Sequence, residues 1–129
     1  MADRGYKAEV KWTSKELTVK ERMILKDGSD AIQLDRETQE AEVIFKPAYY
    51  GIVSVHNEKS KDRKDYEVYV IVDIEGHKYT TGSQSFWNAF SDIMDEVADM
   101  SADEDYSIRV YRRPSKNYSG KDFITCSIC

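Results

Sequence analysis

Residues 66–74, Tyr-Glu-Val-Tyr-Val-Ile-Val-Asp-Ile, open the stretch of sequence that decides the fold. β-Branched residues at every second position, Val68, Val70 and Val72, predict a half-buried strand. A Glu-Gly pair follows the run, and glycine tolerates the positive φ of a tight hairpin turn. The stretch therefore predicts a β-hairpin whose second strand covers residues 77–81.

The apolar period then changes from two residues to that of a helix. Ser83 or Ser85 is placed to cap the helix N-terminus with its hydroxyl oxygen. One apolar stripe follows, at Phe86, Phe90, Ile93, Met94 and Val97. The hairpin is therefore expected to lead into one amphipathic helix with an acidic opposite face.

Length and composition predict one domain over residues 1–129. The chain is 40% hydrophobic and 12% aromatic, which argues against disorder. No stretch is long and apolar enough for a membrane span, and the N-terminus lacks the pattern of a signal peptide. We expect a protein of the cytoplasm, in a bacterial host cell.

The order of the predicted elements suggests a mainly β fold. Residues 1–48 are expected to form an N-terminal hairpin extension, with a long strand at 17–25 and a short return at 31–34. Residues 49–128 then give three strands, the helix and two strands. This order is similar to that of an OB-fold, a five-stranded antiparallel barrel. The alternative is an open antiparallel sheet packed on one helix.

The outward face of the predicted strands combines aromatic rings with guanidinium groups. Nucleic-acid bases stack on aromatic faces, and cationic loops follow the phosphates. The outward-facing residues are Tyr50, Tyr69, Arg109, Tyr111, Arg113 and Phe123. The loop cations that would border them are Lys59, Lys61, Arg63, Lys64 and Lys116. This pattern favours single-stranded nucleic acid as a ligand, although tyrosines on a sheet are also common for structural reasons, and the N-terminal segment could bury them.

Negative charge is concentrated in one part of the chain. The net charge is −5, and residues 92–105 carry seven acids and no base. The exposed face of the predicted helix either is simply solvated or docks a protein partner of a host or phage through Asp92, Glu96 and Asp99. The alternative function to nucleic-acid binding is therefore a non-enzymatic phage protein that binds and inhibits a host protein through this acidic surface. Self-association is left open by the sequence.

The sequence offers no catalytic constellation. His56 and His77 lack the spacing of a zinc site, and no serine lies in a nucleophile elbow. The two cysteines, Cys126 and Cys129, form a single C-terminal pair on an expected strand, which favours a core residue and a chain end over redox or metal chemistry. We therefore expect a protein that is not an enzyme and needs no cofactor.

Two runs of sequence carry a resemblance to a known group of proteins. These are residues 82–90 (GSQSFWNAF) and residues 115–126 (SKNYSGKDFITC), within a similarity that covers residues 49–128. They resemble single-stranded-DNA-binding proteins of bacteriophages and their uncharacterised relatives. The resemblance implies an OB-type module of phage or mobile-element origin, with a role in replication or recombination. The sequence ends on Ile128-Cys129, so we do not expect this protein to recruit replication partners through the acidic C-terminal tail that many such proteins carry.

Overall fold

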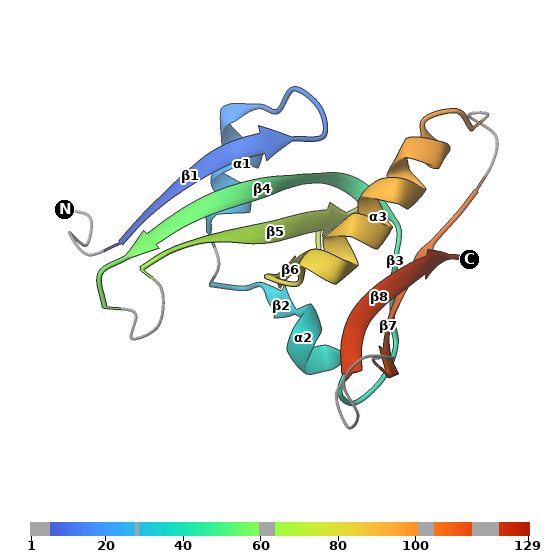
Figure 1. The fold of residues 1–129 in the computed structure, drawn as a ribbon. Helices are drawn as coiled ribbons and strands as arrows, with labels where there is room; N and C mark the ends of the chain where they lie inside the picture. The colour runs from blue at the N-terminus through green and yellow to red at the C-terminus, as the bar shows by residue number, and fades with distance from the viewer. Residues whose placement is uncertain (1–5, 28, 60–63, 101–104, 115–121) are drawn as a thin grey trace. The chain divides into compact units, whose positions relative to one another are not determined.

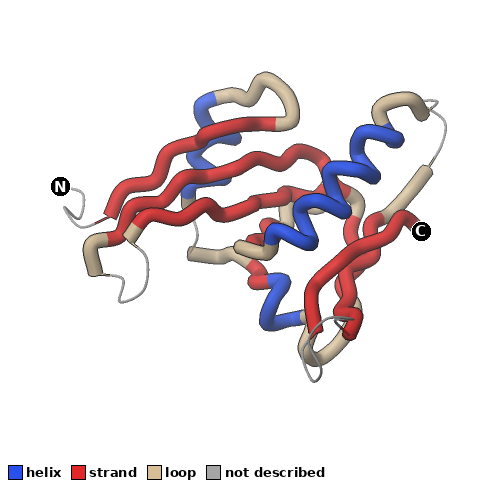
Figure 2. Tube along the Cα trace, viewed as in Figure 1, coloured by secondary structure: helices blue, strands red, loops and turns tan. Residues whose placement is uncertain are grey.

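Eight strands carry most of the fold in the part of the chain that the computed structural model describes, residues 6–27, 29–59, 64–100, 105–114 and 122–129. They form two open sheets, ordered β1-β4-β5-β6-β2 and β3-β7-β8 (Figures 1 and 2). In chain order the elements are β1 (Tyr6–Thr13), α1 (Val19–Lys26), β2 (Ile32–Gln33), α2 (Leu34–Glu37), β3 (Val43–Phe45), β4 (Pro47–Asn57), β5 (Asp65–Asp73), β6 (Lys78–Thr81), α3 (Gln84–Val97), β7 (Ile108–Pro114) and β8 (Asp122–Ile128). The prediction of a mainly β chain with an amphipathic helix is confirmed. The closed OB-like barrel is not confirmed, because the described strands leave both sheets open.

The chain divides into two compact units that alternate along the sequence. The first unit contains residues 1–32 and 48–82, and the second contains residues 33–47 and 83–129. The five-stranded sheet belongs almost entirely to the first unit, and the three-stranded sheet belongs to the second. Each unit is described separately below.

The hairpin predicted at residues 66–81 is confirmed in the first unit, where β5 and β6 pair antiparallel. Gly76 has a φ of 90°, the positive value that its place in the turn requires. The buried carboxylate of Asp73 organises the turn: its Oδ1 accepts from the backbone N–H groups of Glu75 at 3.0 Å and His77 at 2.8 Å. The turn is thus held by one side chain as well as by the strand ladder.

The strand predicted at residues 17–25 is wrong, because residues 19–26 form the helix α1. A capping box starts this helix: the N–H of Glu21 donates to Thr18 Oγ1 at 3.2 Å, and the N–H of Thr18 donates to Glu21 Oε1 at 2.9 Å. These reciprocal bonds satisfy two amides that would otherwise lack partners at the helix start. Local capping therefore outweighs the apparent alternation of apolar residues.

α1 is anchored to the sheet at its C-terminal end. Lys78 of β6 is only 9% exposed, and its Nζ donates to the backbone carbonyl oxygens of Ile24, at 3.0 Å, and Asp27. A cation at this end satisfies carbonyls left open by the helix and opposes the negative end of the helix dipole. Leu25 of α1 packs into a buried core with residues of β4 and β5, namely Tyr49, Val53, Val55, Val70 and Val72.

In the second unit, α3 lies along β8. Ser83 caps the helix as predicted, accepting from the N–H of Phe86 at 3.2 Å. Phe86 and Phe90 are completely buried, with ring centroids 5.6 Å apart in a stacked arrangement. Ser85 donates its hydroxyl to the carbonyl oxygen of Ile124 in β8 at 3.0 Å. The amphipathic helix is therefore confirmed, with its apolar face buried.

Arg112 of β7 holds the short helix α2 against the three-stranded sheet. Its Nε donates to Thr38 Oγ1 at 3.2 Å and its Nη2 donates to the carbonyl oxygen of Asp35 at 2.5 Å. Its Nη1 donates to Asp122 Oδ1 at 2.8 Å. The guanidinium group is thus committed to intramolecular bonds.

None of the described helices combines the length and apolarity that crossing a membrane requires.

Candidate functional site

The outer face of the three-stranded sheet brings together four of the predicted binding residues. The alternation expected in β7 and β8 is confirmed, because Ile108, Val110, Ile124 and Cys126 are buried. The residues that alternate with them along the strands, among them Arg109, Tyr111, Arg113 and Phe123, point to the opposite face of the sheet. Arg113 lies opposite Phe123 in the strand register. We define the β7 face as Ile44, Arg109, Tyr111, Arg113 and Phe123.

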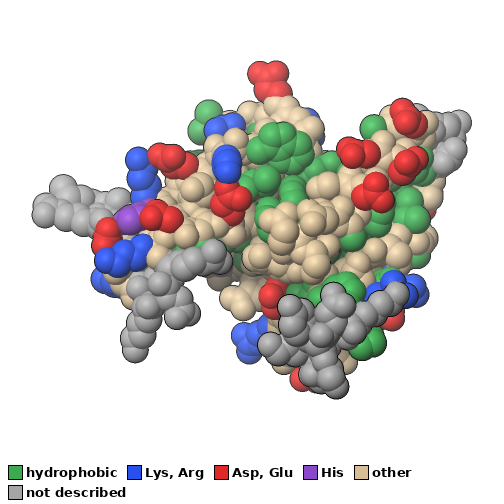
Figure 3. Space-filling view, viewed as in Figure 1, with side chains coloured by type: hydrophobic (Ala, Val, Ile, Leu, Met, Phe, Trp, Pro, Cys, Tyr) green, Lys and Arg blue, Asp and Glu red, His purple; other side chains and the backbone are tan. Residues whose placement is uncertain are grey.

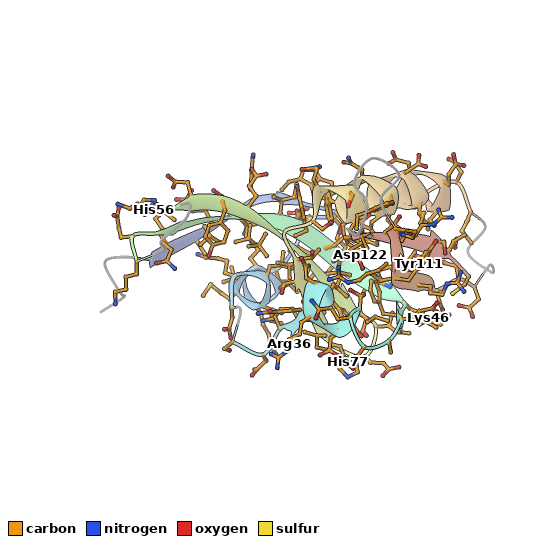
Figure 4. All side chains as sticks on the ribbon, turned by 60° about the horizontal axis from the view of Figure 1, so that its bottom comes forward. Arg36, Lys46, His56, His77, Tyr111 and Asp122 are labelled. Atoms are coloured by element: carbon orange, nitrogen blue, oxygen red, sulfur yellow. The ribbon has the colours of Figure 1, made fainter. Side chains whose placement is uncertain are left out.

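Two groups at the centre of the β7 face are in direct contact. The guanidinium carbon of Arg109 lies 5.2 Å from the ring centroid of Tyr111, within the range of a cation–π interaction. Arg109 Nε is 3.9 Å from Glu42 Oε2, too long for a hydrogen bond. The same Nε atom is covered and has no hydrogen-bond partner among the described residues. Figure 4 labels Tyr111, which belongs to β7 of the three-stranded sheet.

Apolar surface flanks this pair. Ile44 of β3 is 58% exposed and lies opposite Arg109, and Phe123 of β8 is 37% exposed. A planar aromatic base could therefore lie against ring and aliphatic surface while its phosphate approaches a guanidinium group. The β7 face has the chemistry of a small stacking platform.

The other predicted binding residues do not all join this platform. Tyr50, Lys59, Lys64 and Tyr69 belong to the first unit. The prediction that Tyr69 presents its ring to solvent is wrong: it is 5% exposed, and Ile71 on the same face of β5 is 1% exposed. Strand parity placed Tyr69 on the correct face, but that face is covered at this point. Lys61, Arg63 and Lys116 lie outside the described residues.

Trp12 is an exposed aromatic residue that the sequence analysis missed. It is 47% exposed, and its ring centroid lies 5.9 Å from that of Tyr50. Alternation with Ala8 and Val10 would turn Trp12 inward, but the β1–β4 register shifts between Val10 and Trp12. This irregularity reverses the parity, so Trp12 lies opposite Ile52 on the outer face.

The described part of the loop after β4 is less cationic than its lysines suggest. Lys64 Nζ lies 3.3 Å from Glu58 Oε2. His56, near one end of β4 in Figure 4, has Nδ1 2.6 Å from Asp65 Oδ1 and Nε2 2.6 Å from Glu58 Oε1. The hydrogen bonds to Asp65 and then to Glu58 raise the pKa of His56 above its ordinary 6.5. Carboxylates thus accompany the cations at this end of the sheet.

We expect the contribution of His56 to stability to depend on pH. Because its folded pKa is raised, the contribution is full below the unfolded value of about 6.5 and is lost as pH rises through the folded pKa. The difference in urea midpoint between wild type and His56→Gln should therefore shrink from pH 5.5 toward pH 9. An NMR titration in which Asp65→Asn leaves the pKa of His56 unchanged would contradict this assignment.

The predicted acidic helix face is exposed. Asp92, Glu96 and Asp99 all carry exposed side chains, and carboxylates gather over α3 in Figure 3. Beside them runs a groove of about 320 Å³ between α3 and the end of β8. Its lining residues are Asp92, Ile93, Glu96, Val97, Met100 and Ile128. The helix therefore offers apolar surface next to negative charge.

The described residues hold no cluster of His, Cys, Asp and Glu side chains suited to a metal ion. Both cysteines are free thiols. Cys126 is 7% exposed, and burial raises its pKa to about 12, so its sulfur remains a thiol at neutral pH. This agrees with the interpretation of Cys126 as a small core residue.

Comparison with known proteins found no significant match to a family model, to a curated protein or to a solved structure.

Proposed function

We propose that the protein binds single-stranded DNA on the β7 face, with bases stacking on Tyr111 and Phe123 and with Arg109 and Arg113 next to the phosphates. The observation that carries the proposal is the contact between Arg109 and Tyr111 on a partly exposed sheet face, flanked by the exposed apolar side chains of Ile44 and Phe123. Such a face supplies both interactions that a single strand needs, stacking and charge neutralisation.

The proposal does not require a closed barrel. An open antiparallel sheet also stacks unpaired bases on its aromatic residues, as RNA-binding sheets do. An OB-like arrangement rests on the order of the elements predicted for residues 49–128 and on the resemblance of that region. An origin in a phage or mobile element, with a role in replication or recombination, rests on the resemblance alone. The binding proposal rests on the side chains.

A single strand suits this surface better than a duplex. Stacking on a tyrosine requires an unpaired base, which a duplex does not present. The net charge of −5 and the acidic face of α3 oppose non-specific coating of duplex phosphates. We therefore expect modest affinity, strong salt dependence and a preference for unpaired strands.

Replacing Tyr111 should test the stacking contact. Tyr111→Leu keeps a residue of similar volume in the strand but removes the ring, so it should weaken oligonucleotide binding by about 1–3 kcal/mol, roughly 5- to 150-fold in Kd. The matched variant Tyr111→Phe keeps the ring and should bind like wild type. Fluorescence anisotropy of a labelled single strand measures both.

Three results would overturn the proposal. The first is that wild-type protein fails to bind the labelled strand at low salt. The second is that a duplex of the same sequence binds as tightly as the single strand. The third is that Tyr111→Leu and Tyr111→Phe bind equally well. Arg109→Gln adds an independent check, because losing one phosphate contact should reduce the slope of log K against log salt by about 1.

A further inference from the structure

Each unit carries an apolar groove beside a helix, and the two grooves have opposite charges. In the first unit a groove of about 360 Å³ lies between α1 and β1. Its lining residues are Glu9, Val10, Val19, Arg22, Met23 and Lys26. We call this groove the α1 groove, and we call the groove between α3 and β8 in the second unit the α3 groove. The α3 groove has a similar size, about 320 Å³, and is acidic.

The α1 groove exposes apolar side chains that the core of the first unit does not use. Val19 is 78% exposed and Met23 is 56% exposed, although they lie one turn apart on the same helix as the buried Leu25. Arg22 and Lys26 flank them. The one acid in the lining, Glu9, is 2.9 Å from Lys7 Nζ, so the charge of this groove is positive in balance.

The α3 groove repeats this arrangement with the opposite sign. Asp92 and Glu96 of α3 are one helical turn apart, as are Arg22 and Lys26 of α1. In each helix the first charged residue is followed directly by an apolar residue that lines the groove, Ile93 in α3 and Met23 in α1. Two helices with the same spacing and opposite charges can pack their apolar residues together while two ion pairs form at the rim.

We propose that the chain self-associates through these surfaces, with the α1 groove of one copy against the α3 groove of a second copy. Contacts between like grooves would place charges of the same sign together, which disfavours pairing of α1 with α1 or of α3 with α3. Each contact therefore joins unlike grooves, and association either closes, at two copies through two reciprocal α1–α3 contacts or at more copies as a ring, or extends copy after copy. The proposal is independent of nucleic-acid binding.

Charge reversal on each side gives the test. Arg22→Glu with Lys26→Glu makes the α1 side acidic, and Asp92→Lys with Glu96→Lys makes the α3 side basic. Sedimentation velocity without nucleic acid should show the mass of wild type rising with concentration at low salt and returning to that of the 14.9 kDa monomer in high salt. Each reversal alone should weaken association at least about tenfold.

Rescue distinguishes this contact from general charge effects. A chain with both reversals keeps the net charge of −5 and should associate again, as should a mixture of the two single-side variants. Lys20→Glu with Asp95→Lys alters the same helices outside the groove linings and should leave association unchanged. Unfolding midpoints of all variants verify that they are folded.

Wild-type protein that remains monomeric at low salt up to millimolar concentration would overturn the proposal. So would association that survives both single-side reversals, or a combined variant that stays monomeric although it is folded.

Discussion

Replacing Gly51 with alanine should destabilise the first unit strongly. A Cβ atom at this position would lie 2.6 Å from the carbonyl oxygen of Trp12 and 3.0 Å from Cδ1 of Leu25. The oxygen belongs to the backbone of the paired strand β1, so it cannot move without disturbing the β1–β4 ladder next to its register shift. We expect a loss of about 3 kcal/mol in the free energy of unfolding, at the upper end of overpacking effects.

A second glycine supplies the matched control for this prediction. Among the described residues, apart from its two chain neighbours, none places an atom within 4 Å of a Cβ built at Gly82. Gly82→Ala should therefore be neutral or slightly stabilising, because alanine restricts the unfolded chain. Urea unfolding measures both variants, and equal midpoints for Gly51→Ala and Gly82→Ala would show that β1 and β4 do not approach as described.

Removing the carboxylate of Asp73 should give the second large effect. Asp73 is 6% exposed and accepts from two backbone amides of the turn and, at 3.1 Å, from the hydroxyl of Tyr79. Asp73→Ala would leave these donors without their acceptor, and each buried donor left unpaired costs about 1–3 kcal/mol. Water reaches the amides of an exposed turn, so we expect a total loss of about 2–4 kcal/mol.

Two comparisons isolate the hydrogen bonds of Asp73. Glu75→Ala alters an exposed acid in the same turn and should change the unfolding midpoint little. Asp73→Asn keeps one acceptor oxygen but removes the charge. Burial, then the charge and the hydrogen bond of Asp73, raise the pKa of Tyr79 to about 12, so Asp73→Asn should lower that pKa in a spectrophotometric titration. A midpoint for Asp73→Ala equal to that of Glu75→Ala would contradict the proposed role.

Local patterns were sufficient to predict the hairpin and α3. The alternation of residues 66–74, the glycine turn and the cap at Ser83 all lie within a few residues of the structure that they specify. The same holds for β7, where Ile108 and Val110 are buried and Arg109 and Tyr111 point outward. Elements of this kind are encoded by short-range chemistry.

The α1 segment shows how two local signals compete. Its apolar residues alternate imperfectly, which favoured a strand, while Thr18 and Glu21 have the spacing of a capping box. The segment forms a helix because both of its ends are satisfied. The capping box provides partners for amides at the helix start, and the buried Lys78 provides a donor for carbonyl oxygens at the helix end. Only the first of these two contributions is visible in the sequence, since Lys78 lies far along the chain.

The candidate site was predicted in part. Arg109, Tyr111, Arg113 and Phe123 share one face because strand parity and the β7–β8 register place them there. Tyr69 was placed on the correct side of its strand, but both sides of β5 are buried at that point. Trp12 was missed because a shift of register reversed the parity of β1.

The sequence by itself determined the hairpin of residues 66–81, the helix α3, the face of β7 that carries Arg109 and Tyr111, and the position of the acidic helix surface. Tertiary structure decided which faces are covered, where the register of β1 shifts, and that the strands form two open sheets. The physical reason is that parity and capping act between neighbouring residues, whereas burial and register depend on contacts between segments far apart in the chain.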